Sequence, residues 1–201
     1  MIETRFSSRV LRRFVEAVSA ELGADQLRTM LSLSTLSPEW GVSETFLRTD
    51  PAESARIYGS LQDAMRTYYG RGARGVLLRV GQRMWGLLLN DAALLSKAQA
   101  VLIKRLPFAT SRKSILELLA RSIGTQSGDI TVHNVDLDLL LIDHVSPAAE
   151  GQHDSTPICY VTQGLIRESL IWATGQDFDV EEISCKAMGQ EACEFRISAG
   201  K

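Results

Sequence analysis

The 201-residue chain is 45% hydrophobic and 23% charged, which is enough for one substantial hydrophobic core. Its formal net charge of −2 and its pI near 6.0 give no electrostatic basis for binding nucleic acid. No apolar segment follows the basic first residues, so we expect no signal peptide. The longest apolar stretch, residues 75–89, is interrupted by Arg79, Gln82 and Arg83, which excludes a membrane span. We therefore expect a cytoplasmic protein.

Residues 1–50 are expected to form a helical extension of the domain that follows. Helical spacing of apolar residues predicts an amphipathic helix over residues 8–22, and a shorter helix is expected over residues 24–33. The remaining residues resemble a connector, held against the body by two aromatic side chains, Trp40 and Phe46.

Residues 51–201 are expected to form one compact domain that begins with helices. Asp50 and Pro51 are typical of a helix start, as an N-cap followed by proline at the first helical position. Asp91 is expected to cap a later helix in the same way. The helices predicted here cover residues 51–70, 75–90, 91–106 and 111–123.

Three glycines interrupt the second of these helices, at Gly75, Gly81 and Gly86. Each costs roughly 1 kcal/mol relative to alanine in a helix interior. Close helix packing explains them better than contact with a ligand does.

From residue 129 the apolar period changes to two. Two strands are predicted, over residues 130–133 and 136–142, with a turn around Asn134. A helix over residues 157–173 follows, and then a hairpin that turns at Gly189. The expected fold is α+β: a helical N-terminal part packed on a mostly antiparallel sheet of about four strands, with a ββαββ C-terminal half.

All three cysteines lie in this last part, at Cys159, Cys185 and Cys193. The last two face each other across the predicted hairpin, where opposed Cβ atoms lie roughly 4.5–5.5 Å apart. The first stands at a helix start and could supply a third sulfur. Buried thiols or a Cys185–Cys193 disulfide are the alternatives, but nothing indicates an oxidising compartment.

A carboxylate could complete a tetrahedral zinc site, since zinc accepts sulfur and oxygen ligands together. Two candidates precede Cys185, namely Glu181 and Glu182. In a regular strand Glu181 shares the side of Cys185, so Glu182 would need a bulge near Ile183. The residues alone leave both glutamates open.

The segment Cys159–Ile197 resembles the C-terminal half of the 4-vinyl reductase domain. The matching features are Pro157-Ile158-Cys159, Gly164, Thr174-Gly175, Val180-Glu181-Glu182-Ile183-Ser184-Cys185-Lys186-Ala187-Met188-Gly189 and Cys193-Glu194-Phe195-Arg196-Ile197. The resemblance is strong over about forty residues and extends more weakly back to residue 55. It implies the metal ligands Cys159, Glu182, Cys185 and Cys193, and such a closed set is typical of a structural zinc.

The resemblance also implies a function. Domains of this family bind small molecules in sensors, usually dimerise through their helices, and share their fold with haem-type nitric-oxide-binding and TRAPP-type vesicle-tethering domains. In that fold an apolar pocket lies between helices and sheet. We therefore expect a homodimer that binds a small hydrophobic ligand and signals to a partner protein.

The pocket residues proposed from the sequence are Trp85, Leu139, Leu141, Tyr160 and Trp172, with His144 beside the ligand. Core packing is the commoner explanation for the first five, and a surface position at a strand end for the histidine. No helix carries a clear haem-ligand histidine, so haem is not expected.

The first hypothesis is a hydrophobic- or aromatic-ligand sensor with a structural zinc. One alternative is an accessory protein or reductase in tetrapyrrole (bacteriochlorophyll) biosynthesis, a pathway to which one family branch is linked. The other is a ligand-free interaction module. An enzyme is disfavoured, because the sequence contains no nucleophile–base pair, phosphate loop or dinucleotide motif.

Overall fold

The computed structural model describes residues 4–41, 45–46 and 49–199. Helices dominate the first part of the chain and strands the last. The helices are α1 (Ser8–Leu22), α2 (Ala24–Leu33), α3 (Pro51–Tyr69), α4 (Ala73–Asn90), α5 (Leu94–Ile103), α6 (Phe108–Ile123) and α7 (Tyr160–Thr174), with short 3-10 turns at Pro38–Gly41, Gly70–Gly72 and Lys186–Met188.

The strands form one antiparallel sheet in the order β1-β2-β4-β3. They are β1 (Ile130–Val135), β2 (Asp138–Asp143), β3 (Phe178–Ser184) and β4 (Cys193–Ala199). Buried and more exposed residues alternate along β2 and β3, as expected for a sheet with one face on a core and one toward solvent. The predicted α+β class and the ββαββ order are confirmed.

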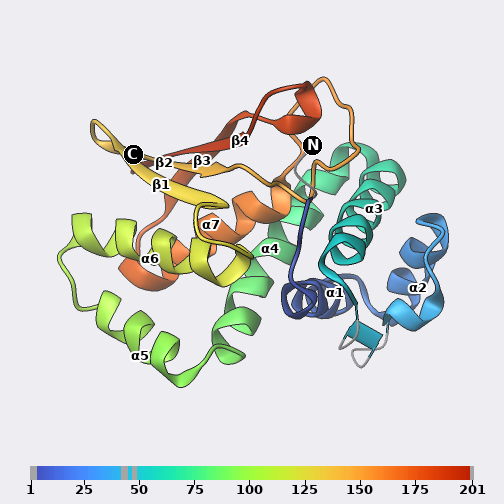
Figure 1. Cartoon of the computed structure of the whole chain (residues 1–201), viewed down its shortest axis with the longest axis horizontal. Coiled ribbons are helices and arrows are strands. Elements are labelled where there is room, and N and C mark those ends of the chain that lie inside the picture. The colour runs from blue at the N-terminus through green and yellow to red at the C-terminus, as the bar shows by residue number, and fades with distance from the viewer. Residues whose placement is uncertain (1–3, 42–44, 47–48, 200–201) are drawn as a thin grey trace.

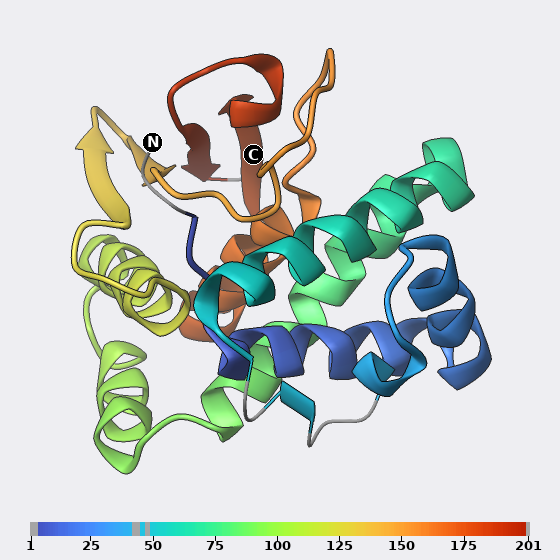
Figure 2. The same cartoon turned by 45° about the vertical axis from the view of Figure 1, so that its right-hand side comes forward.

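Helices cover the buried face of the sheet (Figure 1). Helix α7 packs between the sheet and α4, and α6 packs beside it against β1. Helices α1 and α3 lie on the other side of α4, so the N-terminal helices are separated from most of the sheet by α4 and α7 (Figure 2). One continuous core runs through all these layers.

The helix start at residue 50 is confirmed in detail. The Asp50 side chain accepts hydrogen bonds from the backbone N–H groups of Ala52 and Glu53. In the connector before it, the rings of Trp40 and Phe46 lie 5.6 Å apart and Phe46 is buried. These aromatics hold the connector to the body as predicted.

The prediction that Asp91 caps a helix was wrong. Helix α5 begins at Leu94, with Ala93 at the N-cap, and it ends at Ile103 instead of Leu106. Asp91 is instead taken up by the guanidinium groups of Arg12 and Arg13 on α1, at 3.4 and 2.8 Å. An ion pair with a distant helix thus replaces the local cap.

Three other boundaries also differ from the prediction. Helix α6 begins at Phe108 instead of 111, because the Pro107 carbonyl already accepts from the next turn. Helix α7 begins at Tyr160 instead of 157. The first hairpin turns at residues 136–137 instead of Asn134, with Asp136 in the left-handed region at φ 53°.

In the described part of the chain, no single helix is long and apolar enough to cross a membrane. Only a helix pair bent by 119°, residues 51–90 with 94–103, meets the length and composition criteria.

Candidate metal centre

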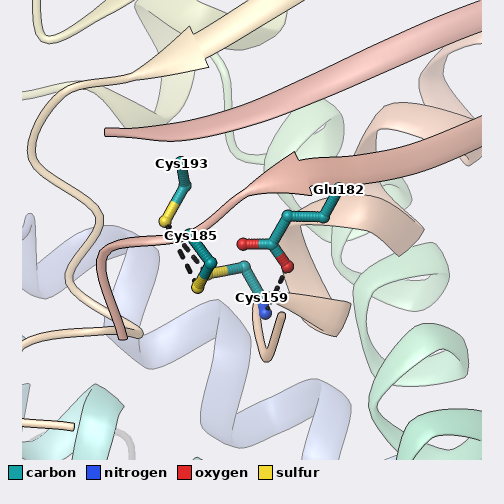
Figure 3. A group of neighbouring side chains, drawn as sticks. All are labelled: Cys159, Glu182, Cys185 and Cys193. Atoms are coloured by element: carbon teal, nitrogen blue, oxygen red, sulfur yellow. Dashed lines mark hydrogen bonds between the residues drawn. The ribbon is translucent and has the colours of Figure 1, made fainter. Parts of the chain in front are cut away.

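Four side chains from separate elements meet at one end of the sheet (Figure 3). Cys159 is the N-cap of α7, Glu182 lies on β3, Cys185 follows the end of β3, and Cys193 begins β4. All four are buried, and one candidate ligand atom from each lies within 4.8 Å of the others.

A bulge in β3 brings Glu182 to this group. Glu182 pairs with Phe195 and Ser184 pairs with Glu194, so Ile183 is an extra residue with no partner on β4. Because of this residue, Glu182 and Cys185 share a side although they are three positions apart. Ile183 is 46% exposed, which a turned-out bulge residue explains. Of the two alternatives from sequence, the structure has the bulge.

Glu181 lies on the opposite face. Its carboxylate is exposed and accepts a hydrogen bond from Arg196 at 2.7 Å. Glu182 is therefore the glutamate that the structure places with the cysteines.

The sulfur spacing fits a tetrahedral ion. The Sγ–Sγ distances are 3.9 Å for Cys159–Cys185, 3.5 Å for Cys159–Cys193 and 3.7 Å for Cys185–Cys193. Zinc–sulfur bonds of about 2.3 Å at tetrahedral angles place two sulfurs about 3.8 Å apart. A disulfide needs about 2.05 Å, and all three thiols are free.

The Glu182 carboxylate has one satisfied and one unsatisfied oxygen. Oε2 accepts a hydrogen bond from the Cys159 backbone N–H at 2.8 Å, and the other oxygen points toward the sulfurs (Figure 3). Oε1 is buried without a hydrogen-bond partner among the described residues. Burial, and then the negative charge of Cys185, raise the pKa of Glu182 to about 8. A cation among the sulfurs would satisfy this oxygen and compensate its charge.

The thiols share one negative charge in the absence of a cation. Hydrogen bonds from Cys159 and Cys193 lower the pKa of Cys185, whereas the hydrogen bond with Cys185 raises the pKa of Cys159. Since zinc binds thiolates, its binding here would release protons.

Hydrogen-bonding groups surround the sulfurs. Ser146 Oγ lies 3.0 Å from Cys193 Sγ and 3.5 Å from Cys159 Sγ, and the Lys186 backbone N–H donates to Cys193 Sγ at 3.3 Å. Such partners orient metal ligands. The Asp143 carboxylate fixes the Ser146 loop by accepting the backbone N–H groups of Val145 and Ser146. Sequence reasoning missed Ser146, because it lies thirteen residues before Cys159.

The residues proposed for a ligand pocket are not brought together. Trp85, Leu139 and Leu141 are buried in the core, and the Trp85 ring meets that of Trp172 edge-on at 5.8 Å. The remaining two lie elsewhere. Tyr160 lines an open groove beside Arg74, and exposed His144 has Nε2 3.4 Å from a threonine hydroxyl.

A different, narrow cavity of about 20 Å³ lies between the helices and the sheet. Its wall is mostly apolar, with a few polar groups, and it includes Tyr58, Ile123, Asp143, Thr162 and Leu165. None of the six proposed pocket residues lines it. Of the neighbouring pair at the end of β2, the sequence had pointed to His144, whereas the residue that lines the cavity is Asp143.

Burial raises the pKa of two groups in this cavity. The pKa of Asp143 rises to about 6, although hydrogen bonds from the backbone of Ser146 and Val145 oppose the shift. The pKa of Tyr58 also rises, through burial and then the nearby Cys159. Since Asp143 holds the loop that carries Ser146, the cavity and the cysteine cluster share a wall.

Comparison with known proteins identifies the C-terminal part. Residues 144–199 match the model of the 4-vinyl reductase domain. No sequence among the curated proteins matches the chain.

The fold occurs in several solved structures. An H-NOX protein from S. oneidensis in the Fe(II)NO state is 13% identical, with a TM-score of 0.59 over 97% of this chain and 99% of that one. A trafficking protein particle complex subunit 3 from Naegleria fowleri, covalently bound to palmitic acid, is 18% identical, with a TM-score of 0.52 over 73% and 93%. The phenol-responsive sensory domain of the transcription activator PoxR, with phenol, is 14% identical, with a TM-score of 0.50 over 72% and 73%.

These matches confirm the resemblance found in the sequence: residues 144–199 belong to the 4-vinyl reductase domain family, within a fold shared with H-NOX domains and a trafficking-particle subunit.

Proposed function

We propose that this chain binds or senses a small, largely apolar molecule between its helices and its sheet, and that a structural zinc ion holds that architecture together. The observation that carries the ligand proposal is the cavity at this junction, with its apolar wall, a few polar groups and a buried carboxylate of raised pKa. This combination is typical of ligand sites.

The proposed zinc ligands are Cys159, Glu182, Cys185 and Cys193. Their support is the sulfur spacing, the unsatisfied Glu182 oxygen and the burial of all four. Zinc bound there would act as a cross-link between α7, β3 and β4, with no open position for hydrolysis.

The cavity must widen to admit an organic ligand. At about 20 Å³ it holds about one water molecule, whereas benzene binds in a cavity of roughly 150 Å³. Ligand binding is thus expected to shift the helices relative to the sheet, and this displacement would be the signal passed to a partner. We further propose a cytoplasmic homodimer as the signalling unit.

Thermal unfolding tests the ligand proposal. The probes are phenol, palmitate and protoporphyrin IX, which represent the ligands of the structural neighbours and the tetrapyrrole alternative. A probe at about 100 times its Kd stabilises by about 2.7 kcal/mol, which raises Tm by about 5–10 °C for a chain of this size. If none of them shifts Tm, the ligand proposal loses its support.

A matched pair of variants locates the site. Ile123→Trp places a large ring in the cavity and should abolish the shift caused by the probe. Ile183→Trp makes the same change at the exposed bulge of β3 and should leave it intact. An unchanged shift in Ile123→Trp would place the ligand elsewhere.

Haem is not part of the proposal. The H-NOX neighbour is described with Fe(II), which in this fold calls for a ligand from the protein. All three histidines of this chain, His133, His144 and His153, lie in the described part and none lines the cavity. The residues present therefore do not fit a haem.

The second candidate is a ligand-free interaction module. The small size of the cavity favours it, since a filled core needs no ligand. It predicts that no probe alters Tm and that Ile123→Trp destabilises the protein by overpacking alone.

A further inference from the structure

Helix α5 turns its most apolar face to solvent. Leu94 and Leu95 are each 84% exposed, and Val101 and Leu102 are also largely exposed. These positions lie about two helical turns apart and form a single face. The buried face carries the smaller Ala100 together with Ile103. This is the reverse of an ordinary amphipathic helix on a soluble domain.

The apolar surface continues into the link to α6. Leu106 and Phe108 are exposed there as well. Helix α5 lies at the edge of the molecule farthest from the sheet, where it joins α4 to α6 (Figures 1 and 2). We define the α5 patch as Leu94, Leu95, Val101, Leu102, Leu106 and Phe108.

The charges around the α5 patch are all positive. Residues 92–116 contain no aspartate or glutamate and five cations: Lys97, Lys104, Arg105, Arg112 and Lys113. The rest of the chain thus carries all 24 acidic residues and only 17 of the 22 basic ones. Within the described part of the chain, one of the five makes an ion pair, Lys113 with Glu117 at 4.0 Å. The segment is a local basic region on a chain of net negative charge.

We propose that the α5 patch binds the surface of an anionic lipid membrane. Its aliphatic and aromatic side chains would enter the boundary between headgroups and acyl chains, to a depth of roughly 5–10 Å. The lysines and arginines beside them would lie against the lipid phosphates. The chain would rest on the membrane without crossing it.

A second copy of this chain fits the patch less well. A standard protein interface buries about 800 Å² on each partner. A helix of ten residues is only about 15 Å long, so the α5 patch alone supplies too little surface. Self-association would also bring two acid-free basic segments together. A membrane requires no minimum footprint and carries the complementary charge.

Flotation of the full chain with vesicles tests the proposal. Binding is expected to vesicles of phosphatidylcholine mixed with phosphatidylglycerol, to be weaker on pure phosphatidylcholine, and to fall with added salt. The double variant Leu94→Glu/Leu95→Glu should lower the partition coefficient tenfold or more. Leu137→Glu alters an equally exposed leucine, 84%, on the β1–β2 turn and should bind like the wild type.

A second pair of substitutions tests the electrostatic part. Lys97→Gln and Arg105→Gln should each weaken binding to the mixed vesicles about fivefold. Because these side chains lie at the surface, circular dichroism and Tm should remain those of the wild type.

Absence of binding to the mixed vesicles would overturn the proposal, and so would unchanged binding by Leu94→Glu/Leu95→Glu. Sedimentation velocity covers the competing occupant. A dimer that dissociates in this double variant, together with no vesicle binding, would assign the α5 patch to self-association instead.

Discussion

Gly81 on α4 lies directly against Gly164 on α7. A Cβ on Gly81 would overlap the Val161 carbonyl oxygen and come within 3.0 Å of Gly164 Cα, and a Cβ on Gly164 would overlap the Leu78 carbonyl oxygen. The backbones of the two helices therefore touch at this crossing. Since α7 also packs on the sheet, the contact fixes the distance between the N-terminal helices and the strands.

Alanine at either glycine should destabilise the protein. Gly81→Ala and Gly164→Ala each force the helices apart, with an expected loss of about 1–3 kcal/mol in the free energy of unfolding. Gly86→Ala on α4 is the control, because a Cβ there meets nothing within 4 Å. This change should be neutral or stabilise by about 0.5–1 kcal/mol. Urea unfolding measures all three, and equal stabilities would contradict the close crossing.

The two adjacent glutamates should differ in their effect on metal affinity. Glu182→Gln removes the proposed anionic ligand and should weaken zinc binding by about 10- to 100-fold or more. Glu181→Gln changes an exposed carboxylate that pairs with Arg196 and should leave the affinity unchanged. Competition with a chromophoric chelator measures both. Weaker binding in the Glu181 variant alone would reverse the assignment.

The buried Asp143 should make stability depend on pH. Its pKa is about 6 in the fold against an ordinary value of 3.8, so the fold favours the protonated form. The stabilisation is complete below about pH 3.8 and is lost as the pH rises through 6, a change on the order of 3 kcal/mol.

Asp143→Asn should remove this loss while keeping an oxygen that accepts the N–H groups of Val145 and Ser146. Its advantage over the wild type should therefore grow between about pH 4 and 6.5. Asp179→Asn changes an exposed carboxylate on β3 and serves as the control. Parallel stability curves for the wild type and the Asp143 variant would refute this account.

Features set by neighbouring residues could be predicted from the sequence. The helix Ser8–Leu22, the Asp50 cap and the left-handed Gly175 at the end of α7 follow from local spacing and backbone preference, and the structure has them. Asp91 was misassigned because the arginines that bind it belong to α1, about eighty residues earlier. A local pattern does not contain that competition.

The candidate site divides in the same way. The three cysteines and the two possible glutamates could be found from spacing alone. The choice of Glu182 depends on the pairing of β3 with β4, which contains one extra residue at Ile183. The cavity could not be found, because Tyr58, Ile123, Asp143 and Thr162 come from separate elements and none has a recognisable motif.

Removal of the metal should destabilise the wild type selectively. Cys185→Ser leaves two sulfurs and one carboxylate, so it should lose the ion and unfold at a lower temperature. A chelator should lower the Tm of the wild type toward that of the variant and leave the variant unchanged. A chelator effect of equal size in both proteins would show that the destabilisation has another cause.

The most direct test is the metal content of protein purified under reducing conditions without added zinc. Elemental analysis should find about one zinc per chain, because a closed structural site retains its ion. Protein that is folded, reduced and free of stoichiometric metal would contradict the proposed zinc site and leave the four side chains as a buried polar cluster.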